Sequence, residues 1–389
     1  MSTTFQALIN DLDIYKNKLL DLREVLLTNL IMINEIPSPT FGEAKRTEFF
    51  VTRLSEYGLQ SCSIDEVGNG VGILPGSAGD KNILIVAHLD SIFGENIDHT
   101  INLEPKYARG PGAGDNSLGL ASILTLPLIL EHLKIKLRSN LIIMGSCRSL
   151  GKGNIEGLRF FLSNTSLPIS AGICVEGVKL GRLSYTSIGM MRCEINCKVP
   201  EFYDWTRFGA VGSIITINKI ISAILGIPVP KEPRTTIVLG SVCGGSSFDT
   251  VATSAYLRFE IRSESQKMVK RIAHQIYNIT EEVSALTDAE ISFDVLAQRK
   301  PGGIRFSHPL AVRTRDIMKK LDIKHMITPS MSELSAFIDN HIPAVTLGLT
   351  DGENMGKTNE TIAIDPVYTG IAQVLGVILA IDKGMCDES

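Results

Sequence analysis

Apolar runs alternate with amphipathic stretches through the first half of the chain and again near its end. Residues 83–87, 140–144 and 172–175 are short and nearly continuous apolar runs, which are typical of buried parallel strands. Apolar residues recur at helical spacing in residues 10–35 and 116–133. Strands that alternate with helices in this way predict an α/β fold, with a mostly parallel sheet and helices on both of its faces.

The pattern changes between residues 189 and 295. Apolar and polar residues alternate there, as in antiparallel strands with one exposed face, and two long amphipathic helices lie between them. We expect a smaller α+β domain over 189–295, inserted into an α/β domain formed by 1–188 and 296–389. The predicted segments are the strands 189–198, 235–242, 255–262 and 291–298 and the helices 205–225 and 265–286.

Composition narrows the class of protein. The 389 residues are 44% hydrophobic and 21% charged with a net charge of −4, which is ordinary for a globular protein and argues against nucleic acid as a partner. No unbroken apolar run reaches about 18 residues, so the sequence predicts no membrane span. The first residues lack the basic and apolar regions of a signal peptide, and the seven cysteines form no Cys-x-x-Cys pair. We expect reduced thiols and a cytoplasmic protein.

Two residues suited to metal binding lie at the ends of predicted elements. His88 follows the strand 83–87, and Asp115 lies in the glycine-rich segment 110–116, before a helix for which Asn116 is a good N-cap. Ligands of open α/β sheets bind at this edge, and imidazole with carboxylate suits zinc. Asp90 is placed to accept a ring N–H of His88 and orient it. A lone His-x-Asp more often marks a satisfied strand-end histidine, but Asp115 among its glycines favours the metal site.

Several motifs carry a resemblance to a known family. The chain resembles, over nearly its full length, the co-catalytic zinc peptidases that include peptidase T, the aminoacylases and acetylornithine deacetylase. This resemblance implies a zinc-peptidase catalytic domain with an inserted lid and dimerisation domain. The motifs are ILIVAHLDSIF, GPGAGDNSLGLA, ICVEG, DWTRFG, VCGGSSFDTVA, KPGG and IPAVTLGLTDGENMGKTNE.

The resemblance also implies a metal centre. A first metal is held in such enzymes by residues that match His88, Asp115 and Glu176 here. A second metal shares the aspartate and adds a glutamate and a C-terminal histidine. A neighbouring glutamate serves as general base, and a lid histidine stabilises the oxyanion across a dimer. Two cations of this kind activate a bridging water and stabilise both oxygens of the tetrahedral intermediate.

The chain departs from this pattern at the positions that carry the chemistry. Leucine cannot coordinate a metal, and a serine hydroxyl is no general base at neutral pH without help. The ligand-contacting positions also differ, although a lysine there keeps the positive charge that would bind a substrate carboxylate. The substituted positions are Ser149 for the base, Leu150 and Gly356 for the second-metal ligands, Tyr203 for the lid histidine, Asp249 for a lid asparagine and Lys300 for an arginine.

Two residues beside the base position, Cys147 and Arg148, are candidate replacements for it. Cys147 is a conceivable nucleophile, but no histidine partner is evident for it. Arg148 is placed to bring a cation near Asp115, although a surface arginine is the simpler interpretation, and we favour it.

These observations leave three functions open. The first is a metallohydrolase-fold protein that has lost most or all hydrolysis and binds a small carboxylate or peptide-like ligand or a partner. The second is an active one-metal hydrolase of small peptides or N-acyl amino acids, which uses His88, Asp115 and Glu176. The third is a purely structural role. We expect at most one divalent ion per chain, zinc before others, or none, and a homodimer formed through residues 189–198 and 205–225.

Overall fold

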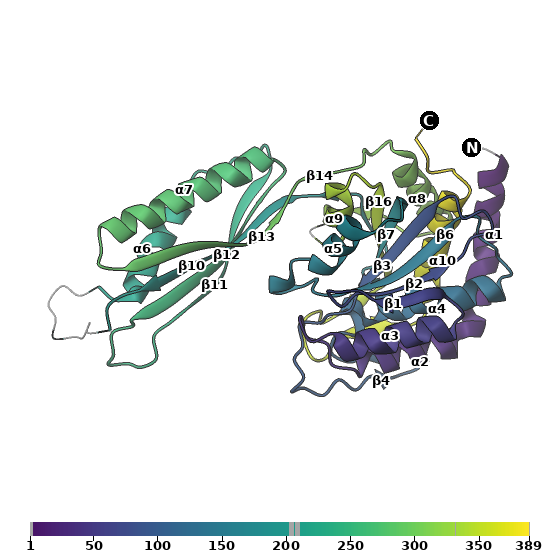
Figure 1. Ribbon diagram of the computed structural model, residues 1–389, viewed down its shortest axis with the longest axis horizontal. Helices are drawn as coiled ribbons and strands as arrows, with labels where there is room; N and C mark the ends of the chain where they lie inside the picture. The colour runs from purple at the N-terminus through teal and green to yellow at the C-terminus, as the bar shows by residue number, and fades with distance from the viewer. Residues whose placement is uncertain (1–2, 202–205, 207–210, 331, 389) are drawn as a thin grey trace. The chain divides into compact units, whose positions relative to one another are not determined.

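The computed structural model describes residues 3–201, 206, 211–330 and 332–388, and the chain forms two compact units (Figure 1). Unit 1 comprises Met1–Ser187 with Gly303–Ser389, and unit 2 is Ile188–Gly302. The alternating pattern predicts that the insertion ends at residue 295. The structure carries it further, because strand β13 (Glu290–Arg299) continues past that point within the sheet of unit 2.

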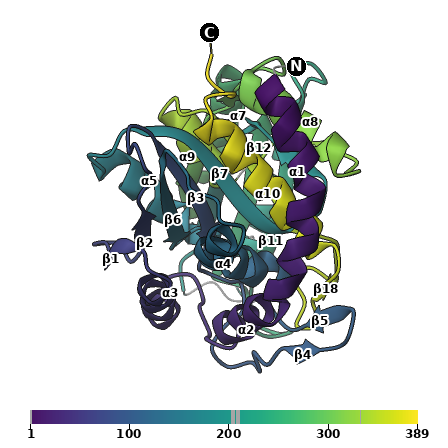
Figure 2. The same ribbon diagram turned by 90° about the vertical axis from the view of Figure 1, so that its right-hand side faces the viewer.

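A mixed eight-stranded sheet forms the centre of unit 1 (Figure 2). Its strand order is β1-β2-β6-β3-β7-β16-β8-β15. The four central strands β6, β3, β7 and β16 are parallel, whereas β2 joins β6 and β8 joins β16 in the antiparallel sense. The mostly parallel sheet predicted from the apolar runs is therefore confirmed. The strands are β1 (Gln60–Ile64), β2 (Gly70–Leu74), β3 (Asn82–His88), β6 (Asn140–Ser146), β7 (Ile169–Val178), β8 (Arg182–Ser184), β15 (Met326–Ile327) and β16 (Ala344–Thr350).

Helices cover both faces of this sheet. Residues 83–87 of strand β3 are all apolar because their side chains alternate between two buried layers. Ile83 and Ile85 lie in one core cluster with α4 and α10, and Leu84 and Val86 lie in another with α5 and α9. The helices of unit 1 are α1 (Thr3–Leu19), α2 (Arg23–Asn34), α3 (Ala44–Glu56), α4 (Leu118–His132), α5 (Glu156–Asn164), α8 (Pro309–Lys320), α9 (Leu334–Asp339) and α10 (Val367–Asp382).

Short elements connect these layers. One small sheet has the order β17-β18-β5-β4, and β9 pairs with β14 in a two-stranded sheet. The segments are β4 (Asn102–Leu103), β5 (Tyr107–Arg109), β9 (Thr186–Ser187), β14 (Gly302–Gly303), β17 (Gly352–Glu353) and β18 (Thr361–Ala363), with the short helical turns η1 (Leu20–Leu22), η2 (Ala113–Ser117) and η3 (Gly151–Gly153).

The helical stretch Ala113–His132 is long and apolar enough to cross a membrane by length and composition alone. Of its most apolar window, however, 89% is buried inside the protein. This stretch contains no unbroken apolar run long enough to predict a membrane span from the sequence. A helix that is apolar on all sides and packed on all sides is a core helix, and that is the place of α4 in unit 1.

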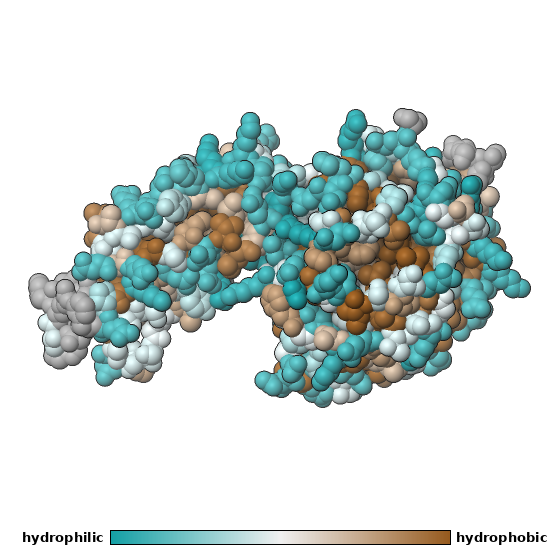
Figure 3. Space-filling model, viewed as in Figure 1, coloured by the Kyte–Doolittle hydropathy of each residue, from teal (hydrophilic) through white to brown (hydrophobic). Residues whose placement is uncertain are grey.

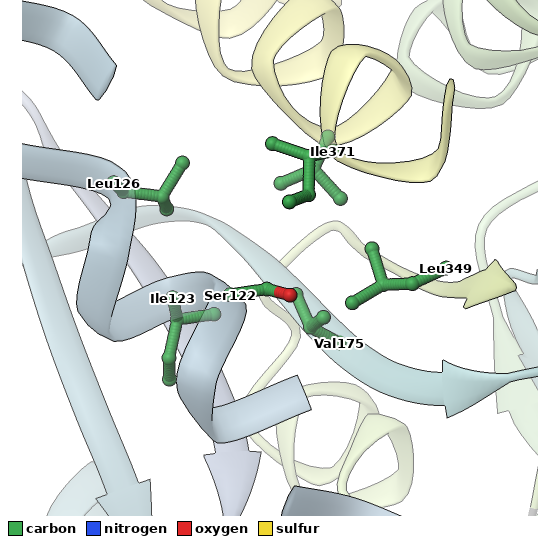
Figure 4. Close-up of a pocket in the computed structure, with 7 residues that line it drawn as sticks. Ser122, Ile123, Leu126, Val175, Leu349 and Ile371 are labelled. Carbon is green, nitrogen blue, oxygen red and sulfur yellow. The ribbon is translucent and has the colours of Figure 1, made fainter. Parts of the chain in front are cut away.

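An apolar seam lies where α4, β7, β16 and α10 meet (Figure 4). Ser122 is the polar member of the seam: it is 3% exposed, and its Oγ has no hydrogen-bond partner. The seam therefore belongs to the packed core and holds no set of polar groups that a ligand would need. The residues drawn and labelled around it are Ser122, Ile123, Leu126, Val175, Leu349 and Ile371.

Unit 2 is a four-stranded antiparallel sheet with two helices. The sheet order is β11-β12-β10-β13, and the helices pack on it around a separate apolar core. β10 pairs along its whole length with both β12 and β13. The prediction that residues 189–198 form an exposed edge for dimerisation is therefore wrong. The edge strands of this sheet are β11 and β13. The expected helix 205–225 begins at Ser213; residues 202–205 and 207–210 lie outside the described chain. The elements are β10 (Gly189–Lys198), β11 (Thr235–Gly244), β12 (Ser254–Ser263), β13, α6 (Ser213–Leu225) and α7 (Gln266–Ala285).

Candidate metal site

His88 is the last residue of β3 and is 3% exposed. Its Nδ1 donates a hydrogen bond to the main-chain oxygen of Asp90 at 2.8 Å, and its Nε2 lies 2.9 Å from Oδ1 of Asp115. Burial lowers the pKa of His88, but hydrogen bonds to Asp115 and Asp90 outweigh it and hold that pKa well above its usual value. With Nδ1 occupied by the backbone, Nε2 is the nitrogen available to a metal.

Asp115 lies in the turn η2 between the sheet and α4. Asn116 does not cap α4 as the sequence suggested, because Ser117 stands at the N-cap position and the side chain of Asn116 bonds to β7. Its Nδ2 donates to Val175 O, and its Oδ1 accepts from Gly177 N, both at 2.8 Å. A Cβ on Gly177 would lie 2.3 Å from the main-chain oxygen of Gly114, so glycine is needed for this close approach. These contacts fix the turn that carries Asp115 against the strand that carries the third ligand.

Glu176 is that third residue, and the two bonds of Asn116 bracket it along β7. It is 8% exposed, and its Oε1 accepts a hydrogen bond from Ser332 Oγ at 3.3 Å. Arg182 Nη1 lies 3.7 Å from the same oxygen. Burial raises the pKa of Glu176 to about 7, although the charges of Arg182 and His88 act in the opposite direction.

The structure thus brings His88, Asp115 and Glu176 together. One ligand-type atom from each lies within 4.8 Å of the other two, and no other such group of three occurs in the described part of the chain. Burial raises the pKa of Asp115, but its hydrogen bond to His88 outweighs this and lowers the pKa below its usual value. One imidazole nitrogen and two carboxylates are a donor set that suits zinc.

The carboxylate of Asp90 is directed mainly away from His88. It is fully buried; Oδ1 accepts from Ser149 N at 3.1 Å, and Oδ2 accepts from Leu150 N and Thr40 Oγ1, each at 2.8 Å. Asp90 Oδ1 lies 3.5 Å from His88 Nδ1, whereas the main-chain oxygen of Asp90 lies only 2.8 Å from the same nitrogen. The predicted orientation of His88 by Asp90 therefore runs chiefly through the backbone, and the carboxylate holds the loop before η3.

Two charged residues near this loop, Glu43 and Arg46, are buried although the sequence pattern did not predict it. Glu43 accepts a hydrogen bond from Arg148 N at 2.8 Å, and Arg46 donates to the main-chain oxygens of Ile36 and Leu89. Burial lowers the pKa of Arg46 to about 10. Both residues lie at the start of α3, whose sequence resembles an ordinary amphipathic helix, so only the tertiary structure reveals their burial.

The positions where the family pattern fails hold no substitute ligands. Ser149 Oγ is 3.1 Å from Ser146 Oγ in a buried pair, and Leu150 contributes only its backbone to Asp90. Gly356 has φ +79°, and a Cβ there would meet only Ile92 Cδ1, at 3.7 Å. Its N–H donates to Glu360, a buried residue whose other oxygen accepts from Gly114 N. Burial raises the pKa of Glu360 to about 7.

The residues weighed as replacements for the base are structural. Cys147 is 1% exposed, its thiol donates to Val67 O, and burial raises its pKa to about 12, which does not suit a nucleophile. Arg148 directs its guanidinium to Glu156 at 2.9 Å and over the ring of Phe41. Arg148 is therefore the partly exposed surface arginine that we favoured.

The remaining predicted residues belong to unit 2. Lys300 is exposed directly after β13, and Asp249 is exposed in the segment between β11 and β12. Asp249 accepts a hydrogen bond from Ser247 Oγ, which lowers its pKa. Tyr203 lies outside the described residues.

Glu333 is a further acid of the site that sequence reasoning missed. It is 2% exposed, precedes α9, and its Oε1 has no hydrogen-bond partner. Its charge acts on both His88 and Glu176 and raises their pKa values. Nothing in the segment 330–336 distinguishes this glutamate from a helix-start residue, so the sequence gives no signal for it.

Comparisons with known proteins agree with this geometry. The model for peptidase family M28 matches residues 69–146. A tripeptidase from Staphylococcus aureus has a TM-score of 0.74 at 19% identity, over 93% of this chain and 99% of that one. The dipeptidase Dug1p from Saccharomyces cerevisiae has a TM-score of 0.78 at 11% identity, over 98% and 99%. YXEP from Bacillus subtilis, a dinuclear metal-binding peptidase of the M20 family, has a TM-score of 0.66 at 14% identity, over 93% and 99%. No curated protein sequence matches.

These matches define a class. The chain has the fold of the metallopeptidases, and the resemblance to zinc peptidases predicted from its motifs is confirmed at the level of that fold. The catalytic-type α/β unit with its smaller second unit is shared with solved structures over nearly the whole length of both chains.

Proposed function

We propose that this protein binds a small carboxylate or peptide-like ligand at a one-metal site and has lost most or all hydrolytic activity. One observation carries the proposal: His88, Asp115 and Glu176 form a complete set, whereas Leu150 and Gly356 offer no side-chain ligand for a second ion. On this proposal the protein is a cytoplasmic homodimer.

The donor set fits one divalent ion. His88, Asp115 and Glu176 would hold it, and the ion would supply a Lewis acid for an oxygen of the ligand. Asn116 fixes two of these ligands relative to each other by its bonds to either side of Glu176. Zinc is the first candidate because the set combines an imidazole with two carboxylates.

The groups that would move protons during amide hydrolysis are lacking at the expected positions. Ser149 Oγ is paired with Ser146 Oγ, and Ser149 is buried. A general base typically contributes about 10²–10⁴ in rate, and one oxyanion donor about 10²–10³. These losses need not multiply, because groups that act together are not additive. Together with the lost second-metal ligands, they favour binding over turnover.

The second candidate is an active one-metal hydrolase of small peptides or N-acyl amino acids. The buried Glu333 favours it, because a carboxyl with an unpartnered oxygen beside the ligand set is a conceivable base. Three protein ligands and an open position are also the usual form of a catalytic zinc site.

A turnover assay separates the two candidates. The full chain is incubated with a panel of dipeptides and N-acyl amino acids and with zinc, manganese or cobalt, beside His88→Ala and Glu333→Gln. We expect no product above the level of His88→Ala. Zinc-dependent cleavage by the wild type that His88→Ala abolishes would overturn the proposal. If Glu333→Gln also lost this cleavage, Glu333 would be identified as the base of the one-metal enzyme.

A further inference from the structure

Arg182 is a cation at the metal site that no motif predicts. It begins β8, and its Nη1 lies 3.7 Å from Glu176 Oε1. This separation is well beyond the 2.7–2.9 Å of a charge-assisted hydrogen bond. In the described part of the chain, the guanidinium has no other ion pair, and the Arg182 side chain is 29% exposed against 11% for that of Glu176. Arg182 therefore holds Glu176 loosely and keeps part of its surface open.

The charges around Arg182 are unequal. Asp115, Glu176 and Glu333 are three acids, and Arg182 and His88 are the positive charges that act on Glu176. In the metal-free site the acids exceed the cations, so an incoming anion is repelled and Arg182 is held as a counter-ion. A divalent ion bound to Asp115 and Glu176 adds two positive charges and replaces Arg182 as the counter-ion of these acids.

We propose that Arg182 is the carboxylate-binding residue of this site, and that a divalent ion and a ligand carboxylate bind cooperatively through it. Without the ion, Arg182 pairs with Glu176. With the ion bound to Glu176, its guanidinium is released to bind the ligand. This inference rests on the proposed function for its metal and its carboxylate ligand, and it moves the carboxylate contact from Lys300 to Arg182.

The chemistry of the side chain supports this assignment. A guanidinium presents a planar fork that matches the two oxygens of a carboxylate, whereas an ammonium is a single point of charge. Lys300 belongs to unit 2, whereas Arg182 lies in unit 1 with the metal ligands. Cooperativity between two ligands is reciprocal, so the metal affinity must rise with carboxylate by the same factor.

Calorimetric titration of the full chain tests the coupling. The probes are zinc, N-acetylglycine and the uncharged N-acetylglycinamide, with the wild type, Arg182→Ala, Arg182→Lys and Lys300→Ala. We expect zinc to tighten N-acetylglycine binding to the wild type by at least about fivefold, with no effect on the amide. Arg182→Ala loses this coupling and binds zinc alone more tightly than the wild type, because the cation beside Glu176 is gone. Arg182→Lys keeps the zinc affinity of the wild type and loses most of the coupling.

The outcomes separate this inference from the proposed function. Zinc binding with undiminished coupling in Arg182→Ala and Arg182→Lys overturns the inference and leaves the proposed function standing. Loss of the coupling in Lys300→Ala alone assigns the carboxylate to Lys300 instead. Failure of the wild type to bind zinc at all overturns both. If Arg182→Ala does not fold, as judged by circular dichroism, Arg182→Lys decides the matter.

Discussion

The carboxylate of Asp90 holds the backbone of Leu150: Oδ2 accepts the Leu150 N–H at 2.8 Å in a fully buried environment. The other oxygen accepts the N–H of Ser149, and Glu43 accepts that of Arg148. Three successive amides of one loop thus donate to two buried carboxylates. The loop that carries Ser149 and Leu150 is therefore fixed through its backbone.

Asp90→Ala is expected to destabilise the protein by about 3 kcal/mol, because it leaves two buried amide N–H groups unpaired. The free energy of unfolding is measured by urea denaturation. Asp98→Ala is the matched control, since Asp98 is an exposed aspartate that accepts hydrogen bonds from Thr100. An equal, small loss in both variants would show that the loop does not depend on Asp90.

Glu43 gives stability a pH dependence of predictable sign. Burial raises the pKa of Glu43 above its usual 4.5, despite the hydrogen bond from the Arg148 amide. Between 4.5 and the raised value the folded state binds more protons than the unfolded state, so this group lowers stability as the pH rises through that window. Urea denaturation at several pH values should show a wild-type advantage over Glu43→Gln that shrinks with rising pH. Parallel curves for the two proteins would contradict this.

Metal analysis should find no more than one divalent ion per chain. The protein is saturated with zinc, dialysed and measured by elemental analysis. His88→Ala should lose the ion, because it removes the imidazole of the only described ligand set. His132→Ala serves as the control, since His132 lies at the surface beside Asp21. Two ions per wild-type chain would be incompatible with the substitutions at Leu150 and Gly356.

The homodimer remains a prediction, and the structure changes the surface that should form it. α6 exposes Ile215 and Leu225, and the edge strand β11 exposes Val242. Figure 3 shows apolar surface on the face of unit 2 that is turned to the viewer. An edge strand beside exposed apolar residues favours pairing between copies. Light scattering should give a dimer mass that Ile215→Asp with Val242→Lys reduces. A monomer mass at every concentration would refute the prediction.

Ser122→Ala is expected to raise the free energy of unfolding by up to about 1 kcal/mol, because it removes a buried hydroxyl without a partner from an apolar seam (Figure 4). Thermal and urea denaturation measure the change. Ser146→Ala is the control: that hydroxyl is equally buried but lies 3.1 Å from Ser149 Oγ, so its removal should destabilise. A loss of stability in Ser122→Ala would mean that the hydroxyl is satisfied.

The apolar runs predicted the centre of unit 1 and the proximity of His88 and Asp115, and the family resemblance added Glu176 to them. Continuous apolar runs identify parallel strands, and residues that follow such strands gather at one edge of the sheet. His88 ends β3, Glu176 lies two residues before the end of β7, and Asn116 ties the turn that carries Asp115 to β7.

Other features could not be predicted from the hydrophobic pattern of the sequence. An alternating strand reveals which of its side chains face inward, but not whether it has one neighbour or two, and so the central place of β10 was missed. The burial of Arg46, Glu333 and Glu43 depends on contacts with segments distant in the chain. A charged residue in an amphipathic helix gives the same pattern whether it is buried with partners or solvated.

The pairing of β9 with β14 has a consequence for how such a protein evolves. The chain leaves unit 1 and returns to it through two adjacent strands, which is the arrangement that lets a whole domain be inserted or exchanged with little disturbance to its host. The three ligand residues and Arg182 are encoded outside the insertion, and Lys300 and Asp249 within it. Selection can therefore alter the inserted unit, with Lys300 and Asp249, while the three ligand residues and Arg182 stay together in the host unit.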